Sequence, residues 1–319
     1  MSEFDLIQHY FTRPTPSATL GVGDDAALLR VAEGMELAVS TDMLVSGTHF
    51  FVDADPYLLG HKTLAVNLSD LAAMGAKPRW ATLSLALPEA NENWLKKFSA
   101  GFFALADEYG VELIGGDTTR GPLNLSVTIM GEVPRGKALR RDGAQLGDDI
   151  WVSGTLGEAA LGLAHLQGKV MLPETIQVCC LAALHQPQPR VALGLALRGI
   201  ANSCIDVSDG LLADLGHILE RSNVAAEVRY DKLPVSSFFA SCGDVMFELT
   251  QQCVLSGGDD YELCFTAPDA RRDEIELLAT YLRLPLKRIG KIVSGRGCKV
   301  RADNGSVMKI EKGGYDHFA

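Results

Sequence analysis

A short acidic loop, Gly21-Val22-Gly23-Asp24-Asp25, carries two adjacent carboxylates and no cation directly beside them. Like charges this close repel each other, and the two glycines let the backbone turn tightly and bring the carboxylates near another group. An Asp-Asp pair alone is more often a solvated turn. Further acids recur beside glycine, serine or threonine, at expected element ends or in apolar surroundings, and so indicate a site: Asp42, Asp70, Asp117, Asp206, Asp209 and Asp259.

These side chains offer hard oxygen ligands, the ligand type that magnesium prefers. The chain has no G-x-x-x-x-G-K-[ST], G-x-G-x-x-G, H-E-x-x-H or G-x-S-x-G motif, and no Cys/His cluster typical of zinc. Many carboxylates on several Mg²⁺ ions imply a substrate rich in negative charge, and ATP with a second phosphate-bearing molecule fits. The Arg140-Arg141 pair is the best candidate for binding a polyphosphate, although two arginines in a linker are usually just solvated.

Composition limits the class of protein. The 319 residues, 47% apolar and 22% charged, predict an ordinary globular protein with room for two domains. A formal net charge of -11 argues against non-specific nucleic-acid binding, and it suits either a collector of divalent cations or simple solubility. The seven cysteines show no C-x-x-C spacing, so we expect reduced core residues. With neither a signal-peptide pattern nor an apolar run of membrane-spanning length, we expect a soluble, cytoplasmic protein.

Periodicity in the first half predicts helices over 3–11, 57–75 and 94–109, and strands over 35–40, 81–87, 111–114 and 123–133. Ser40, Thr41 and Asp42 are expected at the end of one strand. Asp117 is expected just beyond another strand, after a glycine pair. Asp70 interrupts the most apolar part of the helix 57–75, where an unpaired buried carboxylate costs several kcal/mol, so we expect it to have a partner.

The second half is predicted to follow a polar, glycine-rich connection at 134–148, which gives domains at 1–136 and 137–319. Strands are expected over 150–153, 204–207 and 262–266, with helices up to 167, on either side of Pro187–Pro189, and over 211–220 and 270–282. Asp206 is expected at a strand end, whereas Asp209 could simply cap the following helix. The Asp148-Asp149 pair predicts only a turn.

Six segments, in order and over nearly the whole chain, resemble the thiamine-monophosphate kinase family: GVGDDAA (21–27), STDMLVSGTHF (40–50), AVNLSDLAAMG (65–75), LIGGDTT (113–119), IDVSDGL (205–211) and SGGDDYEL (256–263). The resemblance implies the fold of aminoimidazole-ribonucleotide synthetase, a two-domain α/β fold of the α+β type. In that fold the N-terminal domains bind metal and ATP, and their strands close a β-barrel across a homodimer interface. It also implies the reaction ATP + thiamine monophosphate → ADP + thiamine diphosphate, the last step of thiamine diphosphate biosynthesis.

The resemblance also implies roles for individual residues. The Mg²⁺ ligands would be Asp25, Ser40, Thr41, Asp42, Asp70, Asp117, Asp206 and Asp209, with Asp24 limited to charge or a local hydrogen bond. The contacts to ATP would be Tyr109, Gly116, Asp117, Arg141 and Ser208, and those to thiamine monophosphate His49, Asp259 and Tyr315. The acidic loop would then form one wall of an inter-domain magnesium site.

The same resemblance implies direct in-line transfer with Asp42, Asp117 and Arg141 as the catalytic residues. A phosphate monoester has a second pKa of about 6, so the attacking oxygen is already ionised at neutral pH and needs no general base. Magnesium and Arg141 would align the two polyanions and stabilise the transferring group, without a covalent enzyme intermediate.

Three alternatives fit the sequence less well. Selenophosphate synthetases share the implied fold but use a reactive residue near the N-terminus, whereas the first cysteine here is Cys179. Hydrogenase maturation proteins of this fold end in a functional cysteine, whereas this chain ends His317-Phe318-Ala319. A non-catalytic sensor of thiamine phosphate or nucleotide would not need so complete a set of ligands. We therefore expect an enzyme acting on small molecules, with no nucleic-acid or membrane partner.

Overall fold

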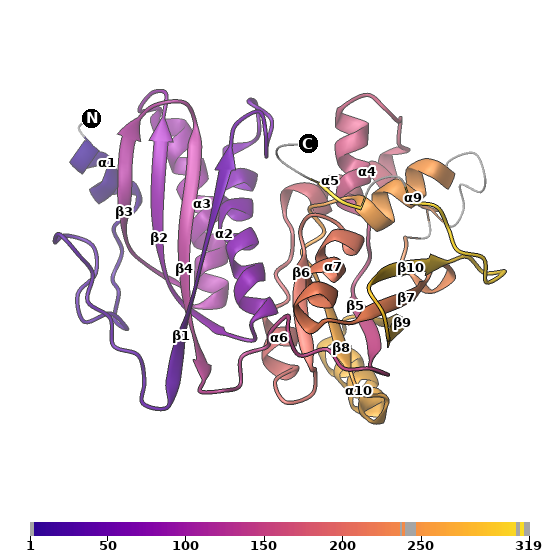
Figure 1. The fold of residues 1–319 in the computed structure, drawn as a ribbon. Helices are drawn as coiled ribbons and strands as arrows, with labels where there is room; N and C mark the ends of the chain where they lie inside the picture. The colour runs from indigo at the N-terminus through magenta and orange to yellow at the C-terminus, as the bar shows by residue number, and fades with distance from the viewer. Residues whose placement is uncertain (1–2, 237, 240–246, 311–312, 316–319) are drawn as a thin grey trace. The chain divides into compact units, whose positions relative to one another are not determined.

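The computed structural model describes residues 3–236, 238–239, 247–310 and 313–315. The chain divides into two compact units, each built on one β-sheet with helices packed against it (Figure 1). Unit 1 comprises Met1–Leu71 and Ala76–Gly136, and unit 2 comprises Ala72–Gly75 and Lys137–Ala319.

Unit 1 contains a four-stranded sheet in the order β1-β4-β2-β3. Its strands are β1 (Met35–Val45), β2 (Lys77–Leu87), β3 (Glu112–Arg120) and β4 (Asn124–Pro134), and β2 and β3 run parallel while the other pairs are antiparallel. Helices α2 (Pro56–Ala73) and α3 (Glu92–Tyr109) cover the same face of the sheet (Figure 1), and α1 (Glu3–Tyr10) contacts α3 and β3. Alternate residues of β2 and β4 are buried under these helices, so one face of the sheet forms the core.

Helix α3 ends where its sequence predicts and begins two residues before the predicted start. The Asn91 side chain accepts a hydrogen bond from the Trp94 N–H at the first turn, and Gly110 ends the helix with φ 65°. Phe98 and Phe102 of the predicted apolar stripe are fully buried, which confirms that the stripe belongs to the core.

Unit 2 contains a six-stranded mixed sheet in the order β10-β7-β9-β5-β8-β6. The strands are β5 (Asp149–Ser153), β6 (Ser203–Val207), β7 (Ala225–Arg229), β8 (Glu262–Ala267), β9 (Leu286–Val293) and β10 (Gly297–Arg301). The helices are α4 (Glu158–Leu166), α5 (Glu174–His185), α6 (Val191–Ala196), α7 (Leu211–Ser222), α9 (Phe247–Ser256) and α10 (Arg272–Leu282). Every residue of β5, β6 and β8 is buried, so these strands form the centre of the unit 2 core.

Two strands are longer than predicted, and this changes the setting of their acids. Strand β1 continues to Val45, so Asp42 lies inside the strand instead of at its end. Strand β3 runs through the glycine pair to Arg120, so Asp117 also lies inside a strand. The pairing with β2 skips Ile114, just before the glycines, and glycine lets β3 continue beside β2, because a Cβ on Gly116 would lie 1.9 Å from the carbonyl oxygen of Leu83.

The Asp148-Asp149 pair is not only the predicted turn: the Asp148 N–H closes a turn on the Gln145 carbonyl oxygen over 3.0 Å, but both acids are buried. Asp149 is completely buried and begins β5, where its Oδ2 atom lies 2.5 Å from Nε of Arg272. Asp148 is 4% exposed and accepts hydrogen bonds from Asn202 and from the Gln145 N–H. Both acids are structural, because distant donors satisfy their charge.

The cysteines largely follow the expectation for a reduced core. Cys180, Cys204, Cys253 and Cys264 are free and buried, whereas Cys179 is exposed and Cys298 half-buried. Cys242 lies outside the described residues. None of the helices in the described part of the chain combines the length and apolarity needed to cross a membrane.

Helices α2 and α3 touch through two glycines. A Cβ on Gly101 would lie 1.9 Å from the Tyr57 carbonyl oxygen, and one on Gly60 would lie 2.1 Å from that of Phe98. Gly101→Ala should therefore lower the free energy of unfolding by about 1–3 kcal/mol, because the helices must separate. Guanidinium chloride denaturation measures the loss.

The matched control is Gly216→Ala in α7, where an added Cβ meets no atom within 4 Å. This change should stabilise the protein by about 0.5–1 kcal/mol, since alanine favours a helix over glycine. Equal effects of the two substitutions would contradict the close approach of α2 and α3.

Candidate active site

Three of the predicted ligands come together in unit 1. Ser40 and Asp42 alternate along β1 and share the side that faces α2. The Ser40 hydroxyl donates to Oδ2 of Asp70 over 2.5 Å, and the Asp42 N–H donates to Oδ1 of Asn67 over 3.2 Å. Asp70 and Asn67 both belong to α2, and Asp70 thus has the partner expected for it. The result is a compact set of oxygen donors between a strand and a helix.

Thr41 and Asp117 lie on the other face of the same sheet. The Thr41 hydroxyl is 2.8 Å from the Thr128 hydroxyl across the β1–β4 pair. Asp117 is exposed and stands opposite Ser84, whose neighbours Leu83 and Leu85 point into the core. Since β1 and β3 are separated by three inter-strand spacings, about 14 Å, one copy of unit 1 does not bring Asp117 to Asp42.

The remaining candidates of unit 1 lie on several different elements. Asp25 is exposed, and its N–H donates to Oδ1 of Asp24 over 2.9 Å, which gives Asp24 the expected local hydrogen bond. The His49 ring is fixed because Nδ1 accepts the Val45 N–H over 3.0 Å, so the neutral ring carries its proton on Nε2. Tyr109 ends α3, half-buried, and Gly116 lies in β3.

In unit 2 the turn between β6 and α7 carries three more candidates. Asp206 is 4% exposed inside β6, and Ser208 and Asp209 are half-buried in the turn. The N-cap of α7 is Gly210, with φ 114° and no side-chain cap, so Asp209 is not the helix cap that it could have been. Oδ2 of Asp214 instead accepts the N–H groups of Ser208, Asp209 and Gly210 over 3.0, 3.1 and 3.2 Å.

Two distant segments lie against this turn. The Asp259 N–H donates to the Ser208 carbonyl oxygen over 2.9 Å, and the Tyr315 N–H donates to the Asp209 carbonyl oxygen over 3.0 Å. The Tyr261 N–H donates to the carbonyl oxygen of Val207 over 2.8 Å. Backbone contacts therefore assemble the unit 2 candidates at one end of β6.

The neighbouring arginines differ in their contacts. Arg140 pairs with Asp142, with Nε 2.9 Å from Oδ1. Arg141 is exposed, and its guanidinium makes no ion pair with any described residue. Of the two, Arg141 is thus the better placed to bind an anion. In the ranges that the structure describes, no three His, Cys, Asp or Glu side chains are grouped closely enough to hold a metal ion.

The chain resembles known proteins over nearly its whole length. Residues 23–133 match the model of the AIR synthase related protein N-terminal domain, and residues 145–303 match that of the C-terminal domain. Thiamine-monophosphate kinase of Escherichia coli (strain K12) is 47% identical over 99% of this chain and 98% of its own. The chain belongs to the thiamine-monophosphate kinase family.

Solved structures of the family agree with the fold. The crystal structure of thiamine-monophosphate kinase from Stenotrophomonas maltophilia K279a is 55% identical and superposes with a TM-score of 0.83 over 92% of each chain. AaThiL complexed with AMPPCP and TMP is 33% identical, with a TM-score of 0.78 over 91% of this chain and 89% of that one. The two-domain fold shared with AIR synthase is thereby confirmed.

The sequence analysis missed Asp214, which holds the β6–α7 turn. An acid in the first turn of the helix after Ser208-Asp209-Gly210 was the available signal, since such a residue can reach the preceding N–H groups. Burial, followed by the charge of Asp209, raises the pKa of Asp214 to about 7, against the opposing effect of the three N–H donors.

The raised pKa of Asp214 predicts a pH dependence of stability. Between pH 3.8 and about 7 the unfolded chain ionises this carboxyl while the folded chain keeps its proton, so stability falls as pH rises. Asp214→Asn does not titrate, and its free energy of unfolding should therefore rise relative to the parent across this window. Urea unfolding at several pH values measures the difference.

The control is Asp53→Asn, which removes an exposed carboxylate of unit 1. The same pH trend in both variants would contradict a specific effect of Asp214. Unfolding is measured without magnesium, so that the ionisation of Asp214 is the quantity compared.

Proposed function

We propose that the chain transfers the γ-phosphoryl group of ATP directly and in line to thiamine monophosphate, with magnesium assistance. The observation that carries the proposal is the pair of oxygen-donor clusters, on β1–α2 and at the end of β6, in a chain that matches the family over its whole length. AaThiL, a relative of known structure, binds an ATP analogue and TMP together. Use of ATP and the free cysteines fit a cytoplasmic enzyme.

The donor atoms fit magnesium. The Ser40 hydroxyl and the Asp70 carboxylate already lie 2.5 Å apart, with Asp42 on the same face, and all three present oxygen. In this proposal the set of magnesium ligands is completed by Asp25, Thr41, Asp117, Asp206 and Asp209. Magnesium, when bound, supplies charge that offsets the repulsion between two polyphosphates.

The remaining residues bind the two substrates. Arg141 and Ser208 would contact the ATP phosphates, with Tyr109 and Gly116 as further contacts. His49, Asp259 and Tyr315 would contact thiamine monophosphate, and the hydrogen bond from Val45 holds the His49 ring so that Nε2–H is its donor. The attacking phosphate oxygen needs no base, because the monoester is already ionised at neutral pH.

We also propose a homodimer in which unit 1 sheets close a barrel. Strands β1 and β3 are the edges of the sheet, and neither has a second neighbour among the described strands. On β1 three apolar side chains are at least 40% exposed, Leu37, Val39 and Met43. An edge strand of eleven residues with exposed apolar side chains is a template for pairing with another strand. We therefore expect a second copy of the chain to cover β1. Pairing of β1 with β3 of a second copy would shorten the distance from Asp42 to the partner subunit's Asp117, although the two side chains leave opposite faces of the sheet.

Asp42→Asn and Asp117→Asn should each lower kcat about a hundredfold or more, because each removes a charge from the transferring group's surroundings. Thiamine diphosphate formation is followed by chromatography, with circular dichroism to check the fold. Asp273→Asn, an exposed acid of α10 that is not among the proposed site residues, should keep full activity.

Mixing the two inactive variants tests the dimer. If Asp42 and Asp117 act from different protomers, each mixed dimer contains one intact site, and random exchange restores about a quarter of the parent activity. No recovery after verified exchange would place both residues in one protomer and contradict the proposed pairing.

Arg141→Ala should raise the KM for ATP about tenfold or more, while the KM for thiamine monophosphate changes little, because a charged hydrogen bond to phosphate is lost. Arg140→Ala is the matched control, since that guanidinium is occupied by Asp142. Equal changes in both KM values for Arg141→Ala would contradict its assignment to ATP.

A further inference from the structure

The loop between α9 and β8 contains a backbone conformation that needs external support. Asp259 has φ 68° and Tyr261 has φ 49°, so two residues with side chains are left-handed within three positions. This region is unfavourable for residues other than glycine, and most of all for an aromatic one. Such strain persists only where surrounding contacts hold it, and Asp259 is the proposed contact to thiamine monophosphate.

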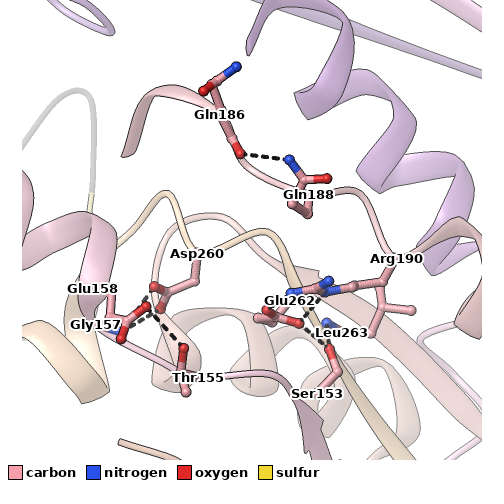
Figure 2. A network of polar contacts seen from close by, with 10 residues as sticks. All are labelled: Ser153, Thr155, Gly157, Glu158, Gln186, Gln188, Arg190, Asp260, Glu262 and Leu263. Atoms are coloured by element: carbon pink, nitrogen blue, oxygen red, sulfur yellow. Dashed lines mark hydrogen bonds and ion pairs between the residues drawn. The ribbon is translucent and has the colours of Figure 1, made fainter. Parts of the chain in front are cut away.

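Several contacts hold the loop from its two sides. Both carboxylate oxygens of Asp260 accept the Gly157 N–H, over 2.9 and 3.1 Å (Figure 2). The Tyr261 hydroxyl donates to Oδ1 of Asp259 over 3.3 Å, so the position of Tyr261 directly affects the carboxylate of Asp259. The next residue, Glu262, begins β8 and is 4% exposed.

Glu262 is held by a buried network (Figure 2). Nε of Arg190 donates to Oε2 over 2.7 Å and Nη2 donates to Oε1, so the pair is bidentate. The Ser153 hydroxyl donates to Oε2 over 2.5 Å and accepts the Leu263 N–H over 2.9 Å. Gly154 leaves room for this carboxylate, because a Cβ there would lie 2.0 Å from Oε1.

A contribution to the stability of the fold does not by itself explain this network. A buried ion pair loses hydration that largely offsets its attraction, and apolar side chains of similar volume often stabilise a fold as well. A bidentate arginine–carboxylate pair does fix direction, because both hydrogen bonds constrain the two planar groups. The network lies directly beside the strained residues Asp259 and Tyr261, where the orientation of a side chain affects binding.

We infer that Glu262, clamped by Arg190 and Ser153, is a positioning residue that orients Asp259 for thiamine monophosphate through Tyr261. The inference rests on the proposed function, and it assigns Glu262 no contact with either substrate. Fixing Glu262 fixes the start of β8, which sets Tyr261 and the hydrogen bond from its hydroxyl to Asp259.

The parent enzyme is assayed first, and failure to form thiamine diphosphate would contradict the proposed function itself. Glu262→Gln and Arg190→Lys should then raise the KM for thiamine monophosphate about tenfold, with the KM for ATP within about twofold, because small displacements of a binding group are costly. Arg190→Lys keeps the positive charge but cannot form two hydrogen bonds to the carboxylate. If Glu262→Gln does not fold, Arg190→Lys alone tests the inference.

Arg272→Lys is the matched control, since Arg272 also pairs through two nitrogens with a buried carboxylate, that of Asp149. It should lower Tm without changing the KM for thiamine monophosphate, and the loss of Tm should be the smaller one because Arg288 and Lys291 lie 3.6 and 3.8 Å from the same carboxylate. Equal KM changes in the two arginine variants, or a change in Tm alone for Arg190→Lys, would show the network to be merely structural.

A double-mutant cycle then separates positioning from direct binding. Asp259→Asn removes the charge while keeping a residue that tolerates the left-handed conformation. In the Asp259→Asn variant, Glu262→Gln should not raise the KM for thiamine monophosphate any further, because the carboxylate that Glu262 orients has already been removed. Additive effects would overturn the inference.

Discussion

Buried carboxylates that must have partners determine how unit 2 is built around β6 and β8. An unpaired buried carboxylate is too costly to keep, so each such acid needs a hydrogen-bond donor. The Asp214 side chain accepts hydrogen bonds from three N–H groups of the β6–α7 turn, and the Asp260 side chain accepts one from the Gly157 N–H. Glu262 takes Arg190. The need to satisfy these structural acids fixes the loops that carry Ser208, Asp209 and Asp259.

The register of one strand pair links these loops. Glu262 stands opposite Val207 in the antiparallel β6–β8 pair, so the end of β6 and the start of β8 coincide. The N–H groups of Asp259 and Tyr261 can then reach the carbonyl oxygens at the end of β6. A one-residue slip would turn the side chains of β8 to the opposite face and break these contacts together. The unit 2 candidates therefore depend on one register.

Sequence patterns predicted most helices and strands, because periodicity and turn residues are local. They also singled out Ser40, Asp42 and Asp70, whose contacts the structure contains. What they could not supply was the identity of distant partners. Arg272, which binds Asp149, is 123 positions away, so the sequence predicted only a turn at Asp148-Asp149. For the same reason the sequence did not predict the ion pair between Arg190 and Glu262, which are 72 positions apart.

The four-stranded sheet of unit 1 poses a different problem, because its candidate acids lie on opposite edges and faces. Periodicity cannot reveal this, since it depends on strand order, and β4 and β2 lie between β1 and β3. A single ion cannot bridge Asp42 and Asp117 across about 14 Å. The exposed apolar side chains of β1 need cover for an independent reason. The pairing of these edges between two copies that we propose would cover β1, and it would also bring β1 and β3 of different copies together.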